Sequence, residues 1–205
     1  MPLSPPADRA PLHARDIALR GFERADGLFD IEATLADTKS YAFTTETRGE
    51  IRPGERLHGM AARMTVDADM RITCFEAAID DSPYPTVCPG AAPNFARLEG
   101  LVIGPGFVRN AMQRVGGTDG CTHLRELLQQ MATVAYQTMY PARARRAAAT
   151  RAAGAPRAAP GLLNTCHGWS SASPVIRDGW PHLYTGGDTS GGVPSEAKAR
   201  PLPAR

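Results

Sequence analysis

The chain has 205 residues, enough for one ordinary domain with tails, and its formal net charge of +2 gives no whole-molecule attraction to nucleic acid or to an anionic membrane. Apolar residues make up 42% of the chain, which allows a core, yet no run of about 18 apolar residues exists to span a membrane. The N-terminus lacks the apolar segment of a secretory signal, so we expect a cytoplasmic location, where the four cysteines would be reduced thiols. The sequence does not identify a small-molecule or protein partner. We do not expect the protein to bind nucleic acid.

Composition divides the chain into five parts. A Pro-rich, polar N-terminus is expected to be disordered, an α+β domain follows, and an Ala/Arg-rich segment is interpreted as a linker or a frayed helix extension. A C-terminal segment with two tryptophans is expected to pack back on the domain, and a disordered tail ends the chain. The boundaries are 1–14, 15–140, 141–160, 161–184 and 185–205.

The first periodic segment predicts a strand. Apolar and polar residues alternate from Phe29 to Leu35, which is typical of an antiparallel sheet with one solvated face. The strand either continues or bends near Asp37. Most acidic residues of this region are interpreted as its solvated face: Asp26, Asp30, Glu32 and Asp37.

Residues 52–79 predict a β-hairpin. The first arm places His58 on the same parity as Met60 and other apolar residues, and residues 67–69, Asp-Ala-Asp, have the chemistry of a turn. His58 is therefore expected to point inward, either as a hydrogen-bonded core residue or as a ligand. Together with the first strand, this hairpin predicts a small antiparallel sheet.

Helices are expected after the hairpin. Residues 91–115 favour two short helices separated by Gly104, Pro105 and Gly106, and residues 122–139 have the apolar spacing of an amphipathic helix. We expect this last helix to pack on the sheet and to end at Pro141. The predicted fold class is therefore α+β, a small antiparallel sheet packed by helices.

Cys121 and His123 stand at the start of the last predicted helix. Gly116, Gly117 and Gly120 would allow a tight turn there, and a helix N-terminus favours a thiolate. Two residues within a helix differ by about 200°, so the side chains converge only if Cys121 lies in the loop or at the cap. The alternative is a packed cysteine beside an exposed histidine.

Other soft ligands are scattered along the chain. Cys88 lies in a Pro-rich loop, where a purely apolar role is harder to explain, and Cys166 and His167 form another pair. No C-x-x-C pair or H-E-x-x-H motif is present, so any metal site would be assembled from distant residues. Zinc or an iron–sulfur cluster would suit the candidate ligands. These are His58, Cys88, Cys121, His123 and Cys166.

Three functions remain open at this stage. The first is a cytoplasmic metal-binding protein. The second is a small metabolic enzyme in which Cys121 is the nucleophile and His123 or His58 is the base. The third is a metal-free interaction module.

Several unusual motifs occur together and in order: "RGFERADGLFDIEATLADTK", "PGERLHGM", "LEGLVIGPGF" and "GGTDGCTHLRELL". From Arg15 to Gln137 the chain resembles a bacterial family, the domain-of-unknown-function family 2889, with a weaker echo at "TCHGW". This resemblance implies no activity.

The order of elements is also similar to that of NifU-type iron–sulfur cluster scaffolds, which implies a NifU- or SufE-like fold with separated ligands. Here His58, Cys88 and Cys121 occupy the three ligand places. Because a histidine replaces the first cysteine and the imidazole follows the last one, the departures favour zinc or another single metal over a cluster.

Overall fold

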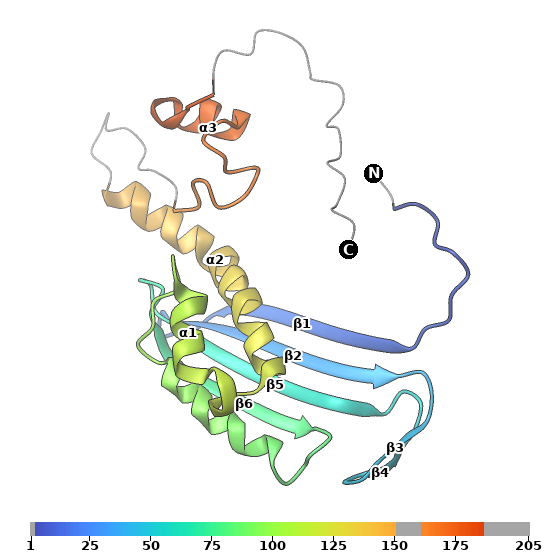
Figure 1. Ribbon diagram of the computed structural model, residues 1–205. Helices are drawn as coiled ribbons and strands as arrows, with labels where there is room; N and C mark the ends of the chain where they lie inside the picture. The colour runs from blue at the N-terminus through green and yellow to red at the C-terminus, as the bar shows by residue number, and fades with distance from the viewer. Residues whose placement is uncertain (1–2, 151–160, 187–205) are drawn as a thin grey trace. The chain divides into compact units, whose positions relative to one another are not determined.

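The structure is a computed structural model and describes residues 3–150 and 161–186 (Figure 1). The chain separates into two compact units, residues 1–149 and 150–205. The expected linker falls partly, and the expected tail almost wholly, outside the described residues. Within the described ranges, no helix is both long and apolar enough to cross a bilayer.

The first unit is built on a four-stranded antiparallel sheet in the order β1-β2-β5-β6. Its strands are β1 (His13–Glu23), β2 (Phe29–Lys39), β5 (Arg56–Val66) and β6 (Ile72–Asp81). A separate two-stranded ribbon, β3 (Phe43–Thr45) with β4 (Gly49–Ile51), connects β2 to β5. The α+β class and the antiparallel sheet expected from sequence are confirmed.

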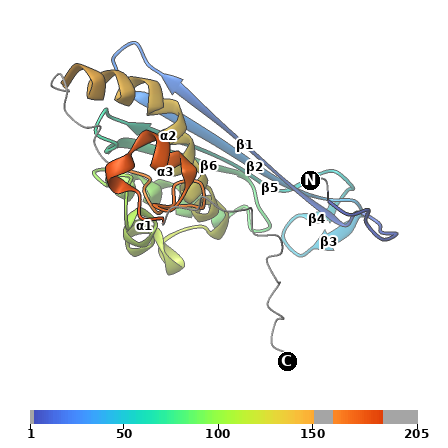
Figure 2. The same ribbon diagram turned by 90° about the horizontal axis from the view of Figure 1, so that it is seen from above.

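The helices of this unit cover one face of the sheet (Figures 1 and 2). They are the 3-10 helix η1 (Cys88–Leu98), α1 (Phe107–Val115), the short η2 (Gly117–Asp119) and α2 (Thr122–Thr150). One apolar core lies between the layers, formed by alternate residues of the strands and by one side of each longer helix. Leu124, Leu128 and Met131 of α2 are fully buried in it, each contributing about 2 kcal/mol.

Two boundaries differ from the sequence-based expectations. β1 begins at His13, so residues 13 and 14 belong to the sheet and not to a disordered terminus. α2 does not end at Pro141 but continues to residue 150. Two arginines that follow the proline make contacts: the Arg143 guanidinium lies 5.2 Å from the Tyr136 ring centre, and Arg146 donates a 2.7 Å hydrogen bond to Asp69.

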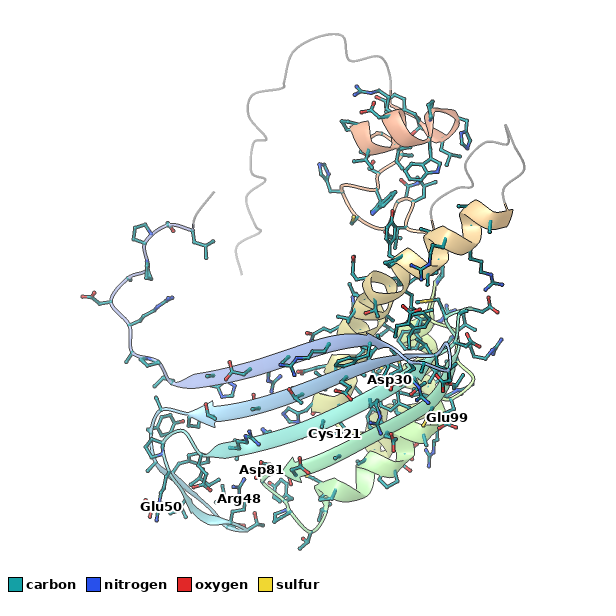
Figure 3. All side chains as sticks on the ribbon, turned by 180° about the vertical axis from the view of Figure 1, so that it is seen from behind. Asp30, Arg48, Glu50, Asp81, Glu99 and Cys121 are labelled. Atoms are coloured by element: carbon teal, nitrogen blue, oxygen red, sulfur yellow. The ribbon has the colours of Figure 1, made fainter. Side chains whose placement is uncertain are left out.

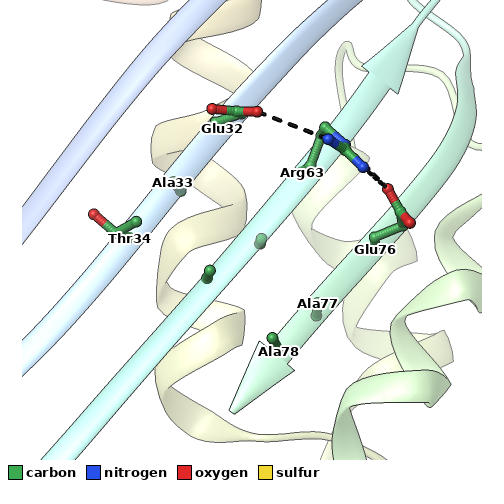
Figure 4. Close-up of a pocket in the computed structure, with 9 residues that line it drawn as sticks. Glu32, Ala33, Thr34, Arg63, Glu76, Ala77 and Ala78 are labelled. Carbon is green, nitrogen blue, oxygen red and sulfur yellow. Dashed lines mark hydrogen bonds and ion pairs between the residues drawn. The ribbon is translucent and has the colours of Figure 1, made fainter. Parts of the chain in front are cut away.

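The opposite face of the sheet carries charged and small side chains. Glu32, Arg63 and Glu76 lie in one cross-strand row, with Arg63 donating to Glu76 (3.0 Å for the Nε bond) and 3.9 Å from Glu32. Together with Thr34 and Ala78 they line a hollow on this face (Figure 4). Exposed ion pairs of this kind contribute little to stability, and no candidate ligand lies among them.

The described part of the second unit, residues 161–186, contains two short helices, α3 (Pro174–Gly179) and η3 (Pro181–Leu183). Ser173 caps α3 by accepting a hydrogen bond from the amide of Ile176, and the Trp169 and Trp180 rings meet edge to face at 5.6 Å. Whether this segment packs back on the first unit stays a prediction.

Candidate functional site

The register of three strands brings three polar residues into one row. Arg15 of β1 lies opposite Asp37 of β2, and Asp37 lies opposite His58 of β5. Asp37 follows Ile31, Ala33 and Leu35 at alternate positions, so its side chain points to the helix-covered face and is only 2% exposed. A buried carboxylate needs charged or hydrogen-bonded partners, and the row supplies them.

Arg15 binds the Asp37 carboxylate with two hydrogen bonds, from Nε to Oδ1 at 2.7 Å and from Nη2 to Oδ2 at 2.8 Å. The third guanidinium nitrogen reaches Glu126 of α2, so this arginine also connects the sheet to the long helix. A two-pronged bond fixes the plane of the carboxylate. Burial raises the pKa of Asp37, but the bonds and charge of Arg15 and the bond from His58 outweigh it, leaving that pKa below its ordinary value.

Three of the chain's five histidines surround this carboxylate. His58 Nδ1 lies 2.9 Å from Asp37 Oδ2, His123 Nε2 lies 3.7 Å from the same oxygen, and His13 Nε2 lies 3.4 Å from Oδ1. The His58 and His123 rings stack with centres 3.9 Å apart. His58 and His123 are mostly buried, whereas the side chain of His13 is 40% exposed.

Burial lowers the pKa of both stacked histidines. For His58 the neighbouring His123 lowers the pKa further, while Asp37 opposes the shift. For His123 the positive charge of Arg15 acts in the same direction as burial, and Asp37 again opposes. The lowered pKa values favour the neutral imidazoles, the form in which a ring nitrogen can act as a metal ligand or a base.

Cys121 completes the arrangement from the start of α2, on the helix-covered side of the sheet (Figure 3). Its sulfur lies 3.8 Å from His123 Nδ1 and 3.9 Å from the Met60 sulfur. Cys121 lies one residue before the first residue of α2. Because it is outside the helix, its side chain can point toward that of His123, as the sequence analysis required.

The glycines before Cys121 are required for that placement. A Cβ on Gly120 would lie 2.0 Å from the Val115 carbonyl oxygen, and one on Gly116 would lie 2.1 Å from that of Met112. Gly117 has a φ of 56°, in the left-handed region that favours glycine. The tight turn expected from sequence is therefore present.

Four of the five sequence-derived candidates gather at one place. His58, Cys88, Cys121 and His123 line a single pocket of about 470 Å³. Cys166 is exposed and belongs to the second unit, whose position relative to this pocket is undetermined. Cys74 was not among these candidates. It lies in β6 opposite Thr65 of β5, and burial raises the pKa of its thiol.

Sequence reasoning missed Asp37, Arg15 and His13. Asp37 shares the parity of Ile31 to Leu35, so strict counting along the strand places it on the apolar face, a signal that was available. Arg15 and His13 offered a weaker signal, because β1 is an edge strand with most residues exposed on both faces. Its sequence therefore lacks the alternation that marks a strand.

Asp37, His58 and His123 can each offer one ligand atom such that all three atoms lie within 4.8 Å of one another. Among the residues that the structure describes, this is the one group of three or more acidic, histidine or cysteine side chains that meets this criterion. Cys88 and Cys121 lie at the same pocket but outside this group.

These features define an α+β protein with a buried aspartate–arginine–histidine cluster beside a pocket. The family described as "Protein of unknown function (DUF2889)" matches residues 13–137, well over half of the chain, and the chain belongs to this family. The matched range contains every residue of the cluster. No curated protein and no solved structure matches the chain, and the likeness to NifU-type scaffolds stays an expectation.

Proposed function

We propose that this protein binds a single divalent transition-metal ion, zinc in the first instance, through Asp37, His58 and His123. The observation that carries the proposal is the convergence of three ligand atoms from two strands and a helix within 4.8 Å of one another.

The separations suit a small ion. A tetrahedral ion with ligand distances of about 2.0–2.1 Å places its ligands about 3.3 Å apart. The distances from Asp37 Oδ2 to His58 Nδ1, 2.9 Å, and to His123 Nε2, 3.7 Å, lie on either side of that value. Binding through Nδ1 requires the His58 tautomer that carries its proton on Nε2, so the ion would replace the hydrogen bond between His58 and Asp37, while Arg15 would hold the carboxylate in position.

The donor set separates the two cofactors considered from sequence. Two imidazoles and one carboxylate are ligands for zinc, and three protein ligands leave a fourth position open, as in catalytic zinc sites. An iron–sulfur cluster is held mainly by thiolates, and neither Cys88 nor Cys121 belongs to the converging group. The geometry therefore favours a single ion over a cluster.

The test is zinc binding to the full chain after treatment with a chelator, measured by competition with a chromophoric chelator. Removing His58 or His123, as His58→Ala or His123→Ala, should weaken zinc binding at least about 100-fold because two ligands cannot complete the shell. Cobalt substitution provides a second measurement, since the visible bands of a tetrahedral Co²⁺ site should disappear in both variants.

The matched control is His13→Ala, which removes a histidine that contacts Asp37 but lies outside the converging group. It should bind zinc as the unaltered protein does, and so should Cys74→Ser. Equal losses in all variants, or no zinc retained by the unaltered protein, would contradict the proposal. Cys88→Ser and Cys121→Ser test whether a sulfur supplies the fourth ligand.

A second function is favoured by one specific contact, the approach of Cys121 Sγ to His123 Nδ1 at 3.8 Å. His123 Nε2 lies 3.7 Å from Asp37, so a thiol, an imidazole base and a carboxylate follow one another, the order of groups used in nucleophilic catalysis. In this alternative the protein is a small metabolic enzyme that works through a covalent intermediate on Cys121.

Alkylation separates the two functions. If the metal-free protein reacts with iodoacetamide at Cys121 much faster than at Cys88, and His123→Ala removes that difference, thiol catalysis is favoured. If no zinc is held and Cys121 is inert, both functions fail and a metal-free interaction module remains.

A further inference from the structure

The pocket beside the candidate metal ligands has the size of a small-molecule site. Its volume of about 470 Å³ lies between strand β5, the start of η1 and the N-terminal end of α2. Small-molecule pockets commonly span about 300–1,000 Å³. His58 and His123 form one wall, so a bound molecule would lie against the proposed metal ligands.

The lining indicates which chemistry the pocket accepts. Among the described residues that line it, none is a lysine, arginine, aspartate or glutamate. Met60, Cys88 and Cys121 contribute three sulfur-bearing side chains. Apart from the thiols, its polar side chains are the two imidazoles, the phenol of Tyr84, the amide of Asn94 and the hydroxyls of Thr118 and Thr122. In the metal-free protein, a charged molecule would lose its hydration there without gaining an ion pair from the lining.

The rim of the pocket exposes large apolar side chains. Tyr84 is 58% exposed and Val87 is 70% exposed, and both line the pocket. Since no charged group accompanies them in the lining, a ligand that covers these two side chains would gain apolar contact area. The rim and the interior therefore both favour an uncharged, largely apolar molecule.

We propose that this pocket binds an uncharged, largely apolar small molecule whose single polar group points toward His58 and His123. The inference rests on the proposed function and deepens it, because that polar group would take the open position of the ion. In this proposal the parts of the site have separate roles. His58 and His123 hold the ion that binds the polar group, and the sulfur-lined interior determines which class of molecule is bound.

Gly90 offers a way to block the pocket while leaving the proposed metal ligands unchanged. It lines the pocket, its φ is not in the left-handed region, and a Cβ built there meets no atom within 4 Å. Gly90→Phe should therefore fill the mouth with a benzyl group. Gly104→Phe is the matched control, because Gly104 has the same open surroundings and lies outside this pocket.

The experiment uses two probes of similar size, the uncharged 2-naphthalenemethanol and the anion 2-naphthoate, with binding to the metal-free full chain followed by ligand-observed NMR. The alcohol should bind the unaltered protein and Gly104→Phe equally. It should bind Gly90→Phe at least about 10-fold more weakly, and the anion should bind the unaltered protein more weakly by a similar factor. The ring-proton resonances of His58 and His123 should shift on adding the alcohol, and those of His13 should not.

The inference is overturned if Gly90→Phe binds the alcohol normally, if the anion binds equally well, or if the two histidine resonances stay unchanged. Zinc titration keeps the two proposals apart. Gly90→Phe should retain zinc binding, since Gly90 is not a ligand. Zinc binding without alcohol binding would refute only the pocket inference, whereas alcohol binding without zinc binding would refute only the metal function.

Discussion

Asp37 is the residue on which the whole cluster depends, because its buried carboxylate accepts hydrogen bonds from Arg15 and His58 on either side. This position could have been predicted from strand parity alone, since Asp37 continues the inward series of β2. The contacts of Asp37 could not, because they depend on the pairing register of three strands. Sequence patterns indicate which way a side chain points, but not which distant residue it faces.

The stability of the metal-free protein should fall as the pH is lowered from about 7 to 5. The pKa values of His58 and His123 lie below the ordinary value of about 6.5, so in this range the unfolded chain binds protons more readily than the folded one. Their contribution is therefore present above about pH 6.5 and is lost as the pH falls through the folded pKa values. Urea unfolding at both pH values measures the change.

The double variant His58→Gln with His123→Gln removes both titrating rings, and its stability should change less between the same two pH values. Asp37 acts in the same direction at lower pH, since its depressed pKa makes its contribution disappear only below about pH 4. An equally steep loss in the double variant would show that other groups cause the acid sensitivity.

Gly120 should not tolerate a methyl group. Gly120→Ala would place a Cβ 2.0 Å from the Val115 carbonyl oxygen, and this backbone atom cannot move aside without shifting the end of α1. We expect a loss of about 1–3 kcal/mol of unfolding free energy, measured by urea denaturation. Gly104→Ala, where a Cβ meets nothing, should be neutral or slightly stabilising, and equal effects in the two variants would contradict this account.

At the scale of single elements, the β5–β6 hairpin could be predicted almost completely, whereas β1 could not. The hairpin combines clear alternation with a turn whose first residue, Asp67, has the right chemistry. β1 is an edge strand on which only Ile17 and Leu19 are partly buried, so its sequence resembles a solvated segment. α2 was predicted from its apolar face, but its end was placed at Pro141, because a proline after an apolar periodic segment is the usual signal of a helix end.

The turn of this hairpin provides a prediction at the same scale. Asp67 Oδ1 accepts hydrogen bonds from the amides of Asp69 and Arg71, both at 2.9 Å, and so holds the chain reversal. Asp67→Ala leaves two backbone donors without this partner and should reduce the unfolding free energy by about 1–2 kcal/mol. Asp69→Ala removes only an exposed ion pair with Arg146 and should have a smaller effect. A larger loss in Asp69→Ala, measured in the same urea titrations, would contradict this assignment.

For the whole molecule, the α+β class can be predicted from local sequence patterns. The site cannot, because it forms only when strands and a helix that are distant in sequence pack together. His58, Cys121 and His123 were identified by residue type and local position, and the fold brings them to one pocket. The carboxylate and the guanidinium that organise them come from strands whose pairing the sequence does not reveal. Cys166 was identified on the same grounds of residue type, but it belongs to the other unit, so its membership of the site stays a prediction.

The first unit should fold and bind zinc without the second. Among the described residues, the buried members of its core cluster run from Phe29 to Met139, and the partly buried residues packed against them extend to Ala142, so residues 1–149 contain this cluster. A chain ending at Ala149 should therefore unfold cooperatively, with a free energy within about 1 kcal/mol of the full chain's value, as judged by urea denaturation. Its affinity for zinc should also be unchanged, because Asp37, His58 and His123 are all retained. A large loss of stability would show that the C-terminal segment packs back on the domain, as the sequence leads us to expect. A selective loss of zinc with stability preserved would instead identify Cys166 or His167 as a ligand.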